Sequence, residues 1–508
     1  MNSVSEGCLP FRPRSAPGSK HMHFSGFKSV VLSCVEEYFD TTAVAIVQYL
    51  MEVAFGTLND LVTAVRLPPD IIKTSMMALL RHNIAFFVEL PVIRNGHELS
   101  RKHMVYGVFS EQAMVRMFCP IVLPRVSDLD GLGDQLLAAL TLGGSMTAPE
   151  ILEVLRTMGV DVGLPRLLET LSTLLSRGVV QRSSELRERC QNLLTSVYYA
   201  HHHQSHNVKG PDSTEPPRKH SHGLHSLESD NVSDSGESYC VSVEQLIALF
   251  QEEELADYVC TVYDRDMGTV FRAALFISNS FQALGFCPFS PADVRPSTRS
   301  FNLEQLHDAL MNAQYSLNAT GSNFTLSFCA SVLKLYVSEP KAMMHMTSDG
   351  QYIVDIDAAI ERMQMAVLLR IVAERHGPMA RRMFNIIRAR GMMEASVVAA
   401  EGIIPRSQAV SLLTTLCTEG YLQITMLSTS VEPKVETSYF LYSINPNFSS
   451  VAANAAFTCL YNMRSKLKQI EELQFTLLAS NQVQRINDQI DLIEPIYIKL
   501  VETAMLLF

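Results

Sequence analysis

Three segments of the chain repeat one local pattern, which is a short helix, a turn, a longer helix and a β-prone run. They begin at Leu58, Thr147 and Glu394. Along each longer helix, apolar residues recur at intervals of three and four, so each helix has one face to bury. Each longer helix is expected to end at a residue type that tolerates left-handed backbone, namely Asn83, Gly178 and Gly420.

A further helix is predicted before each repeated segment, over residues 43–54, 133–142 and 379–390. A helix followed by a helix–turn–helix and a strand is the outline of a winged helix. After the first segment, the Asn95-Gly96 pair is a strong hairpin signal and predicts a wing. The run 438–444 is a second candidate wing strand, after the third segment.

Residues 240–356 give a less regular fourth unit, with helices expected over 302–310 and 324–337. The run 343–356 resembles a wing with Asp349-Gly350 at its tip. Near the C-terminus, apolar residues step by three and four in two series, 460–477 and 483–500, which predicts an antiparallel helical hairpin or coiled coil. The expected fold is therefore mainly α with small β wings, as four tandem winged helices and a C-terminal hairpin.

Composition changes along the chain suggest the domain limits. Residues 201–239 are rich in His and Ser and poor in large apolar side chains, so they cannot offset the entropy of ordering. The predicted parts are a disordered N-terminus (1–25), winged helices (26–112, 126–200, 240–357 and 358–447), a disordered linker (201–239) and the hairpin (456–508).

Composition and motifs also limit the function. The net charge is −11, so any contact with nucleic acid must be local or made inside a larger assembly. No phosphate-binding loop, nucleophile elbow or metalloprotease motif is readable, and the ten Cys include no Cys-x-x-Cys pair. We expect no catalytic residue, metal or cofactor. No run of about 18 apolar residues occurs, so no membrane span is expected.

Two groups of basic residues are candidate contacts for nucleic acid or a partner. The first winged helix offers Lys73, Arg81 and His82 on its longer helix and Arg101 and Lys102 on its wing. They could contact phosphates or form a solvated face beside a protein. Residues 360–390 hold seven Arg against two acidic residues. They could meet DNA, an acidic partner or other subunits, and the candidates chosen from them are Arg381, Arg382, Arg388 and Arg390.

The order of modules resembles the winged-helix subunit of the RNA polymerase III-specific heterotrimer, which is related to transcription factor IIE alpha. Local similarity lies in the segments 27–51, 241–275 and 379–424. The chain departs from that family in its short hairpin, His-rich linker and lack of Trp. The resemblance implies a non-catalytic nuclear subunit. It would bind two heterotrimer partners, the polymerase clamp and the polymerase III initiation factor, and promoter DNA is a possible further partner.

In that role it would recruit the polymerase and help to open DNA at genes such as those for tRNA and 5S rRNA. A free-standing winged-helix regulator or a scaffold of another multi-subunit complex is the alternative. Four winged helices spread along one chain argue against that alternative. A helical enzyme is a third hypothesis, and the absent motifs argue against it.

Overall fold

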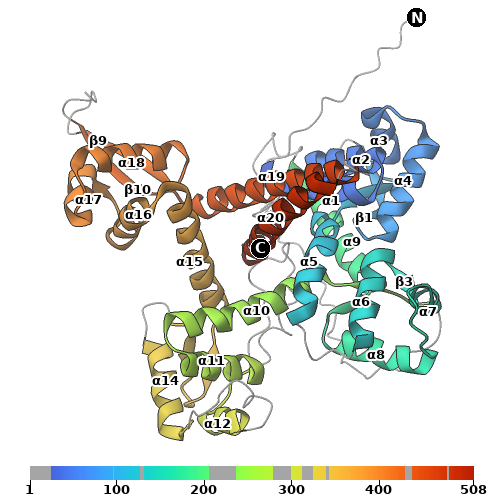
Figure 1. The fold of residues 1–508 in the computed structure, drawn as a ribbon. Helices are drawn as coiled ribbons and strands as arrows, with labels where there is room; N and C mark the ends of the chain where they lie inside the picture. The colour runs from blue at the N-terminus through green and yellow to red at the C-terminus, as the bar shows by residue number, and fades with distance from the viewer. Residues whose placement is uncertain are drawn as a thin grey trace, which may run out of the picture. The chain divides into compact units, whose positions relative to one another are not determined.

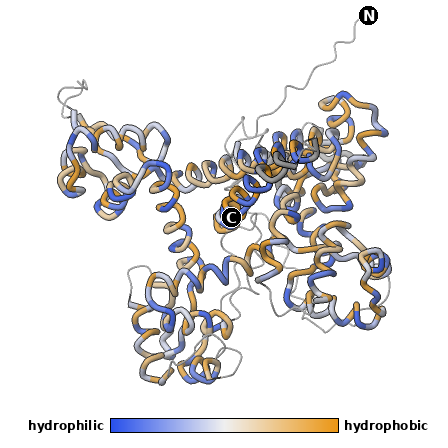
Figure 2. The backbone as a smooth tube through the Cα atoms, in the orientation of Figure 1, coloured by the Kyte–Doolittle hydropathy of each residue, from blue (hydrophilic) through white to orange (hydrophobic). Residues whose placement is uncertain are grey.

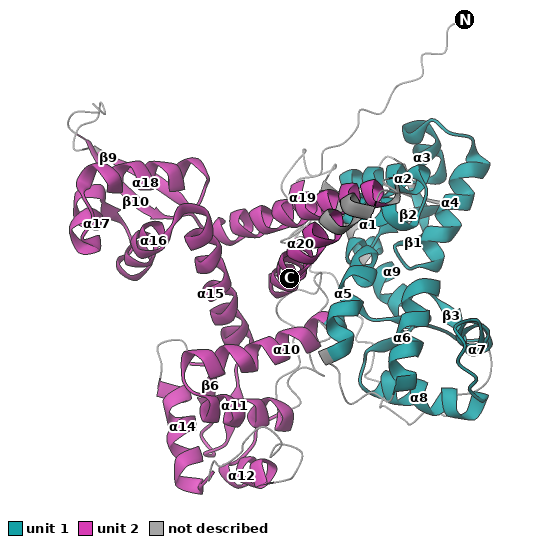
Figure 3. Ribbon diagram, viewed as in Figure 1, with its two compact units in different colours: residues 1–19, 31–246, 286–291 teal, residues 20–30, 247–285, 292–508 magenta. Residues whose placement is uncertain are grey.

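The computed structural model describes residues 25–94, 97–125, 131–204, 236–278, 299–311, 324–338, 342–428, 438–476 and 480–507. These residues form mostly helices with small antiparallel sheets, as predicted (Figure 1). The chain divides into two compact units, shown in Figure 3. Unit 1 contains residues 31–246 and unit 2 contains residues 20–30, 247–285 and 292–508. Along the helices, apolar and polar residues alternate at short intervals (Figure 2).

Unit 1 begins with a helix, a helix–turn–helix and a long hairpin. Thr57 and Asp60 form a capping box at the start of α3, in which the side chain of each accepts a hydrogen bond from the backbone amide of the other. Asp40 caps α2 and also accepts a 2.8 Å hydrogen bond from the hydroxyl of Ser75 on α4. The predicted hairpin turn at residues 95–96 lies outside the described residues. The elements are α2 (Thr41–Val53), α3 (Leu58–Val65), α4 (Pro69–Arg81), β1 (Ala85–Arg94) and β2 (His97–Val108).

The second helix–turn–helix of unit 1 has the same local design. Thr147 and Glu150 form a second capping box at the start of its middle helix. The order of its three-stranded sheet is β3-β5-β4, so the central strand comes from beyond the predicted linker. Its elements are α6 (Gly131–Gly143), β3 (Met146–Thr147), α7 (Ala148–Thr157), α8 (Leu164–Ser176), β4 (Val180–Arg182) and β5 (Ser238–Val241).

Strand β5 changes the expected boundary between the linker and the third winged helix. Residues 238–239 were expected in the linker and 240–241 in the third winged helix. All four pair instead with β3 and β4 of the second helix–turn–helix. The partners of Tyr239 in this sheet are Met146 and Arg182. The sheet needs a middle strand because β3 and β4 do not pair with each other. Most of the predicted linker, residues 205–235, lies outside the described residues, as do residues 1–24 of the N-terminus.

A long helix joins the two halves of unit 1. Helix α9 (Ser183–Gln204) packs against β1 and continues to residue 204, beyond the expected start of the linker at residue 201. Its buried residues Leu186, Leu194 and Tyr198 share a core with Phe86 and Val88 of β1. Three short helical segments complete the unit: η1 (Ser110–Met114), α5 (Val115–Val122) and η2 (Leu123–Arg125).

Unit 2 contains a further helix–turn–helix with a short wing. Asn302 and Gln305 cap the second helix reciprocally, at 3.0 and 2.8 Å. The wing pairs Met344 with Val354, and Gly350 at its predicted tip has φ of 75°. The two predicted helices and the predicted wing are therefore confirmed. The elements are α11 (Arg265–Ile277), α12 (Leu303–Met311), α14 (Leu326–Ser338), β6 (Met344–Met346) and β7 (Tyr352–Val354).

The last helix–turn–helix of unit 2 has a three-stranded sheet of order β8-β10-β9. The predicted wing strand 438–444 is confirmed and pairs Tyr442 with Ile424. The residues predicted to end the longer helices, Asn83, Gly178 and Gly420, have φ of 56°, 73° and 84°, which confirms that prediction. The elements are α16 (Pro378–Arg390), β8 (Met393–Glu394), α17 (Ala395–Gly402), α18 (Arg406–Thr418), β9 (Leu422–Ser428) and β10 (Ser438–Ile444).

Two long helices form the predicted C-terminal hairpin. Helix α19 (Phe448–Thr476) starts before the expected residue 456, and α20 is Ser480–Leu506. Ile470, Ile486 and Ile493 are buried between the two helices. The early turns of α19 are held by other elements, because Ala452 is fully buried and the Phe457 ring meets that of Phe27 at 5.4 Å. Packing on α1 (Ser25–Tyr38) explains the earlier start.

Helix α15 (Ile356–His376) links the third and fourth helix–turn–helix segments and contacts α16, α19 and α20. The Gln364 side chain donates to the carbonyl oxygen of Leu506 at 2.9 Å, and Gln251 of α10 (Val243–Val262) donates to that of Met505 at 3.1 Å. These bonds satisfy carbonyl groups at the end of α20 that have no partner within the helix. Within the part of the chain that is described, no helix has the length and apolarity to cross a membrane.

Candidate partner and nucleic-acid interface

Helix α16 carries four of the predicted site residues. Its buried face consists of Ala380, Met383, Phe384 and Ile387, which follow helical spacing. The helix starts at a proline, and Gly391, with φ of 88°, ends it. Because that face is buried, the remaining sides of the helix carry the exposed guanidinium groups of Arg381, Arg382, Arg388 and Arg390.

Two of these arginines are tied to the neighbouring helix α17. Arg382 donates from Nη1 to the carbonyl oxygen of Gly402 at 3.1 Å. Arg390 Nε lies 3.5 Å from Glu401 Oε2, and both side chains are well exposed, so this ion pair adds little stability. The side chains of Arg381 and Arg388 have no hydrogen bond or ion pair with any described residue. They are therefore the two cations of α16 that are free to meet an external anion.

An open groove of about 460 Å³ runs along α16 beside Arg381, Arg382 and Arg390. The buried Oδ1 atom of Asn385 lies in its wall and accepts no hydrogen bond from the residues that the structure describes. Glu401 is the one acidic residue of its lining, so the groove is cationic overall. It is lined by Pro378, Arg381, Arg382, Asn385, Ile386, Ala389, Arg390 and Glu401.

The uncharged residues of this groove were not among the predicted site residues. Ile386 and Ala389 have no chemistry that marks a site, and Asn385 is a common helix residue. The spacing of Arg381, Asn385 and Ala389 at intervals of four is the signal that could have placed them on one side of α16.

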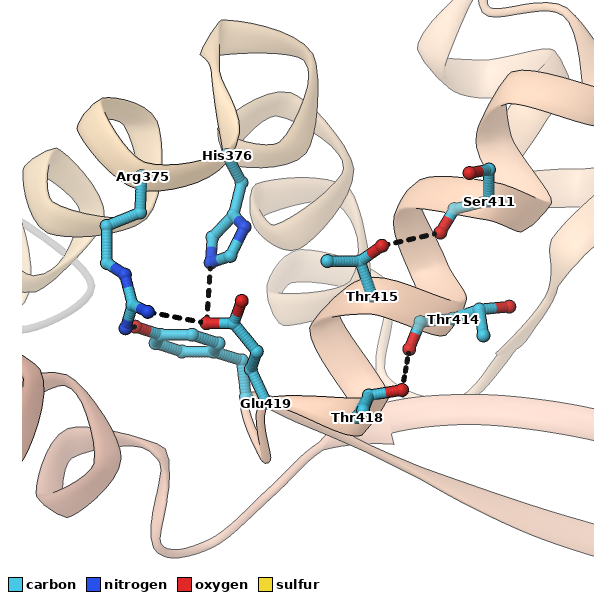
Figure 4. Close-up of polar contacts among 8 residues, drawn as sticks. Arg375, His376, Ser411, Thr414, Thr415, Thr418 and Glu419 are labelled. Carbon is cyan, nitrogen blue, oxygen red and sulfur yellow. Dashed lines mark hydrogen bonds and ion pairs between the residues drawn. The ribbon is translucent and has the colours of Figure 1, made fainter.

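The arginines of α15 are not among the residues that line this groove. Arg375 Nη2 lies 3.1 Å from Glu419 Oε2 (Figure 4). Its Nη1 donates to the Tyr421 hydroxyl at 3.3 Å. His376 Nε2 is 3.2 Å from the same carboxylate oxygen. The contacts of this oxygen with Arg375 and His376 are both ion pairs, and neither has the geometry of a hydrogen bond. Burial raises the pKa of Tyr421. Arg362 lies over the ring of Tyr263 at 5.7 Å. The run of seven arginines is thus divided between two helices.

Helix α18 occupies the place of a DNA-reading helix but is almost uncharged. Arg406, at its first position, is its single ionic side chain. The Thr415 hydroxyl donates to the carbonyl oxygen of Ser411 at 3.0 Å, and Thr418 donates to that of Thr414 at 2.9 Å (Figure 4). The Thr hydroxyl protons are thus used within the helix, and Arg406 is the one cation that α18 offers to phosphate oxygens.

The candidates on α4 differ in their surroundings. Lys73 lies in the second turn and pairs with Asp70 at 3.4 Å, with both side chains exposed. Arg81, at the C-terminal end, lies 3.8 Å from Glu150 of α7. Its carbonyl oxygen also accepts a 2.8 Å hydrogen bond from the Ser145 amide. The structure therefore places Arg81 at the contact between the two helix–turn–helix segments of unit 1.

His82 follows α4 and faces the interior. Burial, with Arg116 and Arg81 close by, lowers its pKa to about 4, so the imidazole is neutral at pH 7. Arg116 Nη2 is 3.5 Å from its Nδ1, and the Arg116 guanidinium also lies over the Tyr38 ring at 4.3 Å. His82 is thus a packing residue of unit 1, and it offers no positive charge to a phosphate.

The candidates on the first wing lie on β2. Lys102 is exposed and pairs in register with Pro91 of β1. Arg101 belongs to the same strand, but its side chain lies outside the description. The structure thus brings the four arginines of α16 together on one helix of unit 2, while Lys73, Arg81, Arg101 and Lys102 lie in unit 1. Among the described residues, no cluster of three His, Cys, Asp or Glu side chains could hold a metal ion.

The fold defines a protein of the winged-helix class, with a basic surface on α16. Three family models match it in succession along the chain. The model for the RNA polymerase III subunit RPC82 helix-turn-helix domain matches residues 29–90 and that for RNA polymerase III subunit RPC82 matches 169–363. The model for the POLR3C C-terminal winged-helix domain matches residues 368–444. The chain belongs to the RNA polymerase III subunit RPC82 family, a family of the transcription apparatus.

Curated relatives agree with this assignment. The chain is 22% identical over 223 residues to the DNA-directed RNA polymerase III subunit RPC3 of Danio rerio. It is 18% identical over 217 residues to the protein of the same name from Homo sapiens. These matches cover 43% and 42% of this chain and 38% of each relative, so the chain matches well under half of their length.

Proposed function

We propose that this chain is a non-catalytic subunit of RNA polymerase III that acts in transcription initiation in the nucleus. Its partners in this proposal are two smaller heterotrimer subunits, the clamp of the polymerase core and the polymerase III initiation factor. It recruits the polymerase to small non-coding RNA genes, such as those for tRNA and 5S rRNA, and assists DNA opening. The family matches over residues 29–90, 169–363 and 368–444 are the observation that supports this proposal.

The chemistry of α16 supports a direct electrostatic role. Arg381 and Arg388 lie seven residues apart, which is two helical turns, so both project from the same flank of α16. Guanidinium groups bind phosphate oxygens through paired donors. We assign promoter DNA, held within the polymerase assembly, as the anion that this flank meets, and we leave Arg382 and Arg390, which contact α17, outside the DNA contact.

Unit 1 offers a second and smaller contact in this proposal. Lys73 and Lys102 are exposed, and the weak pair of Lys73 with Asp70 is easily exchanged for a phosphate. Arg101, the residue before Lys102, stays a candidate of the same wing. Arg81 contributes less, because it faces Glu150 of α7.

The first experiment is purification of the tagged chain from nuclear extract, with identification of the accompanying proteins by mass spectrometry. We expect the polymerase III core and two small subunits in near-equal amounts. A preparation that contains the chain alone, or ubiquitin-pathway proteins in place of the polymerase, would refute the proposed function.

The second experiment tests α16 within the assembled polymerase. The double variant Arg381→Glu, Arg388→Glu should reduce promoter-dependent transcription. It should also lower the salt dependence of promoter binding by about 0.9 for each phosphate that the variant no longer binds. The matched control is Arg156→Glu, Arg166→Glu, which changes the net charge equally at exposed positions of α7 and α8. Equal activity of both double variants would remove DNA from the role assigned to α16.

A further inference from the structure

Ile403 has a backbone conformation that its residue type disfavours. It follows α17 with φ of 53° and ψ of 49°, in the left-handed region, and its amide bonds back to the carbonyl oxygen of Ala400 at 3.2 Å. A β-branched residue is strained there, because its branched side chain crowds the backbone. Its side chain is 85% exposed, so packing within the chain does not compensate.

The same turn in the other units shows that the fold does not require isoleucine. After α3, the corresponding position is Arg66, with φ of 59°. After α7, the left-handed residue is Gly159, with φ of 84°. Glycine removes the strain, since it has no side chain to crowd the turn. An exposed isoleucine at this point therefore lowers stability without an internal benefit.

The helices on either side of Ile403 expose further apolar side chains. Val397 of α17 is 45% exposed and Val410 of α18 is 39% exposed. Arg406 is the one charged side chain of α18, and the Thr hydroxyl protons of this helix are donated to its own carbonyl groups. Exposed apolar side chains such as these have little to offer a phosphate backbone and are typical of protein contacts.

The residues before Ile403 contact the arginines of the basic groove. Gly402 and Glu401, the two residues before Ile403, contact Arg382 and Arg390 of α16. Glu401 itself lines the groove, two residues before the isoleucine. A partner that covers both features must offer an apolar pocket with acidic residues along one edge, because a basic or neutral edge would leave the arginines uncompensated.

We propose that Ile403 anchors the fourth winged helix in an apolar, acid-edged pocket of a protein subunit. The proposal rests on the proposed function, since the partner is another protein of the polymerase III assembly. It gives α18 and its preceding turn a protein partner, and it leaves DNA to the Arg381 and Arg388 flank of α16. Anchors of this kind are central apolar side chains that fill a pocket of the partner.

Photo-cross-linking tests the proposal in the assembled complex. A benzophenone amino acid is placed at position 403 of the tagged full-length chain, and position 66 is the matched control because it has the same backbone conformation. After purification and irradiation, we expect position 403 to cross-link to one protein subunit, at apolar residues next to Asp or Glu. A cross-link to DNA, or none in an assembled polymerase, would overturn the inference and leave the proposed function intact.

Replacement by glycine separates anchoring from folding. Ile403→Gly and Arg66→Gly should each leave the melting temperature of the isolated chain unchanged or raise it by about 1–3 °C, because both relieve left-handed strain. Removal of the anchor should weaken partner binding by about tenfold or more in Ile403→Gly alone, since a buried isoleucine contributes more than one factor of ten. A lower melting temperature for Ile403→Gly would make it a folding residue and refute its role as an anchor.

The wild-type preparation separates the two proposals. If it contains no polymerase subunits, the proposed function fails, and the inference that depends on it fails as well. If it contains the polymerase but Ile403→Gly retains every subunit with unchanged affinity, the inference alone is wrong.

Discussion

Tyr198 donates its hydroxyl proton to the carbonyl oxygen of Pro91 at 2.8 Å, across 107 residues of sequence. The tyrosine lies on α9 and is 3% exposed, and the proline lies on β1. The bond gives the buried phenol hydroxyl an acceptor and the strand carbonyl a donor. It therefore connects the helix that follows the second helix–turn–helix to the hairpin of the first.

We expect Tyr198→Phe to lower the free energy of unfolding of unit 1 by about 1 kcal/mol, since a buried hydrogen bond is removed while the ring is kept. Urea denaturation measures the change. Tyr461→Phe is the control, because Tyr461 is 37% exposed on α19. An equal effect of the two substitutions would show that the bond to Pro91 does not stabilise unit 1.

Glu111 should make stability fall as the pH rises. Burial raises its pKa from 4.5 to about 7, opposed by the Ser110 hydroxyl and assisted by nearby Glu244. Between these pH values the unfolded chain has released the proton and the folded chain keeps it, so folding becomes less favourable with increasing pH. Glu111→Gln should raise stability by about 1–3 kcal/mol at pH 8 and much less at pH 5.

Denaturation at both pH values tests the Glu111 prediction. Exposed Glu89 on β1 supplies the control Glu89→Gln, which should change stability little at either pH. A Glu111→Gln variant that is less stable at pH 8 than the wild type would contradict the prediction, because it would mean that the ionised carboxylate stabilises the fold.

Asp40 should be the costliest cap to remove from unit 1. Its two carboxylate oxygens accept from the Ala43 amide and from the Ser75 hydroxyl, each at 2.8 Å, and Ser75 is 5% exposed. Asp40→Ala should lower stability by about 2–3 kcal/mol, since it removes a helix cap and leaves a buried hydroxyl without its acceptor. Asp70→Ala, at an exposed position of α4, should cost less than about 1 kcal/mol in the same thermal melts.

Gly420 should not tolerate a side chain at its left-handed turn. With φ of 84°, and with a Cβ placed 3.4 Å from Val451, Gly420→Ala should lower stability of unit 2 by about 1–2 kcal/mol. Gly131→Ala is a suitable control, because no heavy atom lies within 4 Å of a Cβ there and its φ is not left-handed. Calorimetry that finds the two variants equally stable would contradict the prediction.

Features decided by neighbouring residues could be predicted from the sequence. The longer helices end at Asn83, Gly178 and Gly420 as expected, because the tolerance of these residues for positive φ is local. The wing strand 438–444 and the helices of the C-terminal hairpin follow from apolar spacing. For the site, the exposed arginines of α16 could be predicted because the buried positions of that helix are readable.

Features decided by contacts between residues far apart in the sequence could not be predicted from it. Nothing in the charge of Arg81 shows that it faces Glu150, and nothing in the type of His82 shows that it is buried beside Arg116. Strand β5 is four residues long, and its partners lie on the far side of a segment with no pattern of its own. Ile403 reads as an ordinary apolar residue until its backbone angles and exposure are known.

The position of β5 sets the order in which unit 1 can be completed during synthesis. Since β5 lies between β3 and β4, those strands have no ladder partner until the ribosome has delivered residue 241. A fragment that stops at residue 204 would expose both strand edges, while a chain cut between 205 and 235 could still be rejoined by this strand without a covalent link. The sheet of the second helix–turn–helix is therefore assembled from two parts of the polypeptide that are separated in sequence.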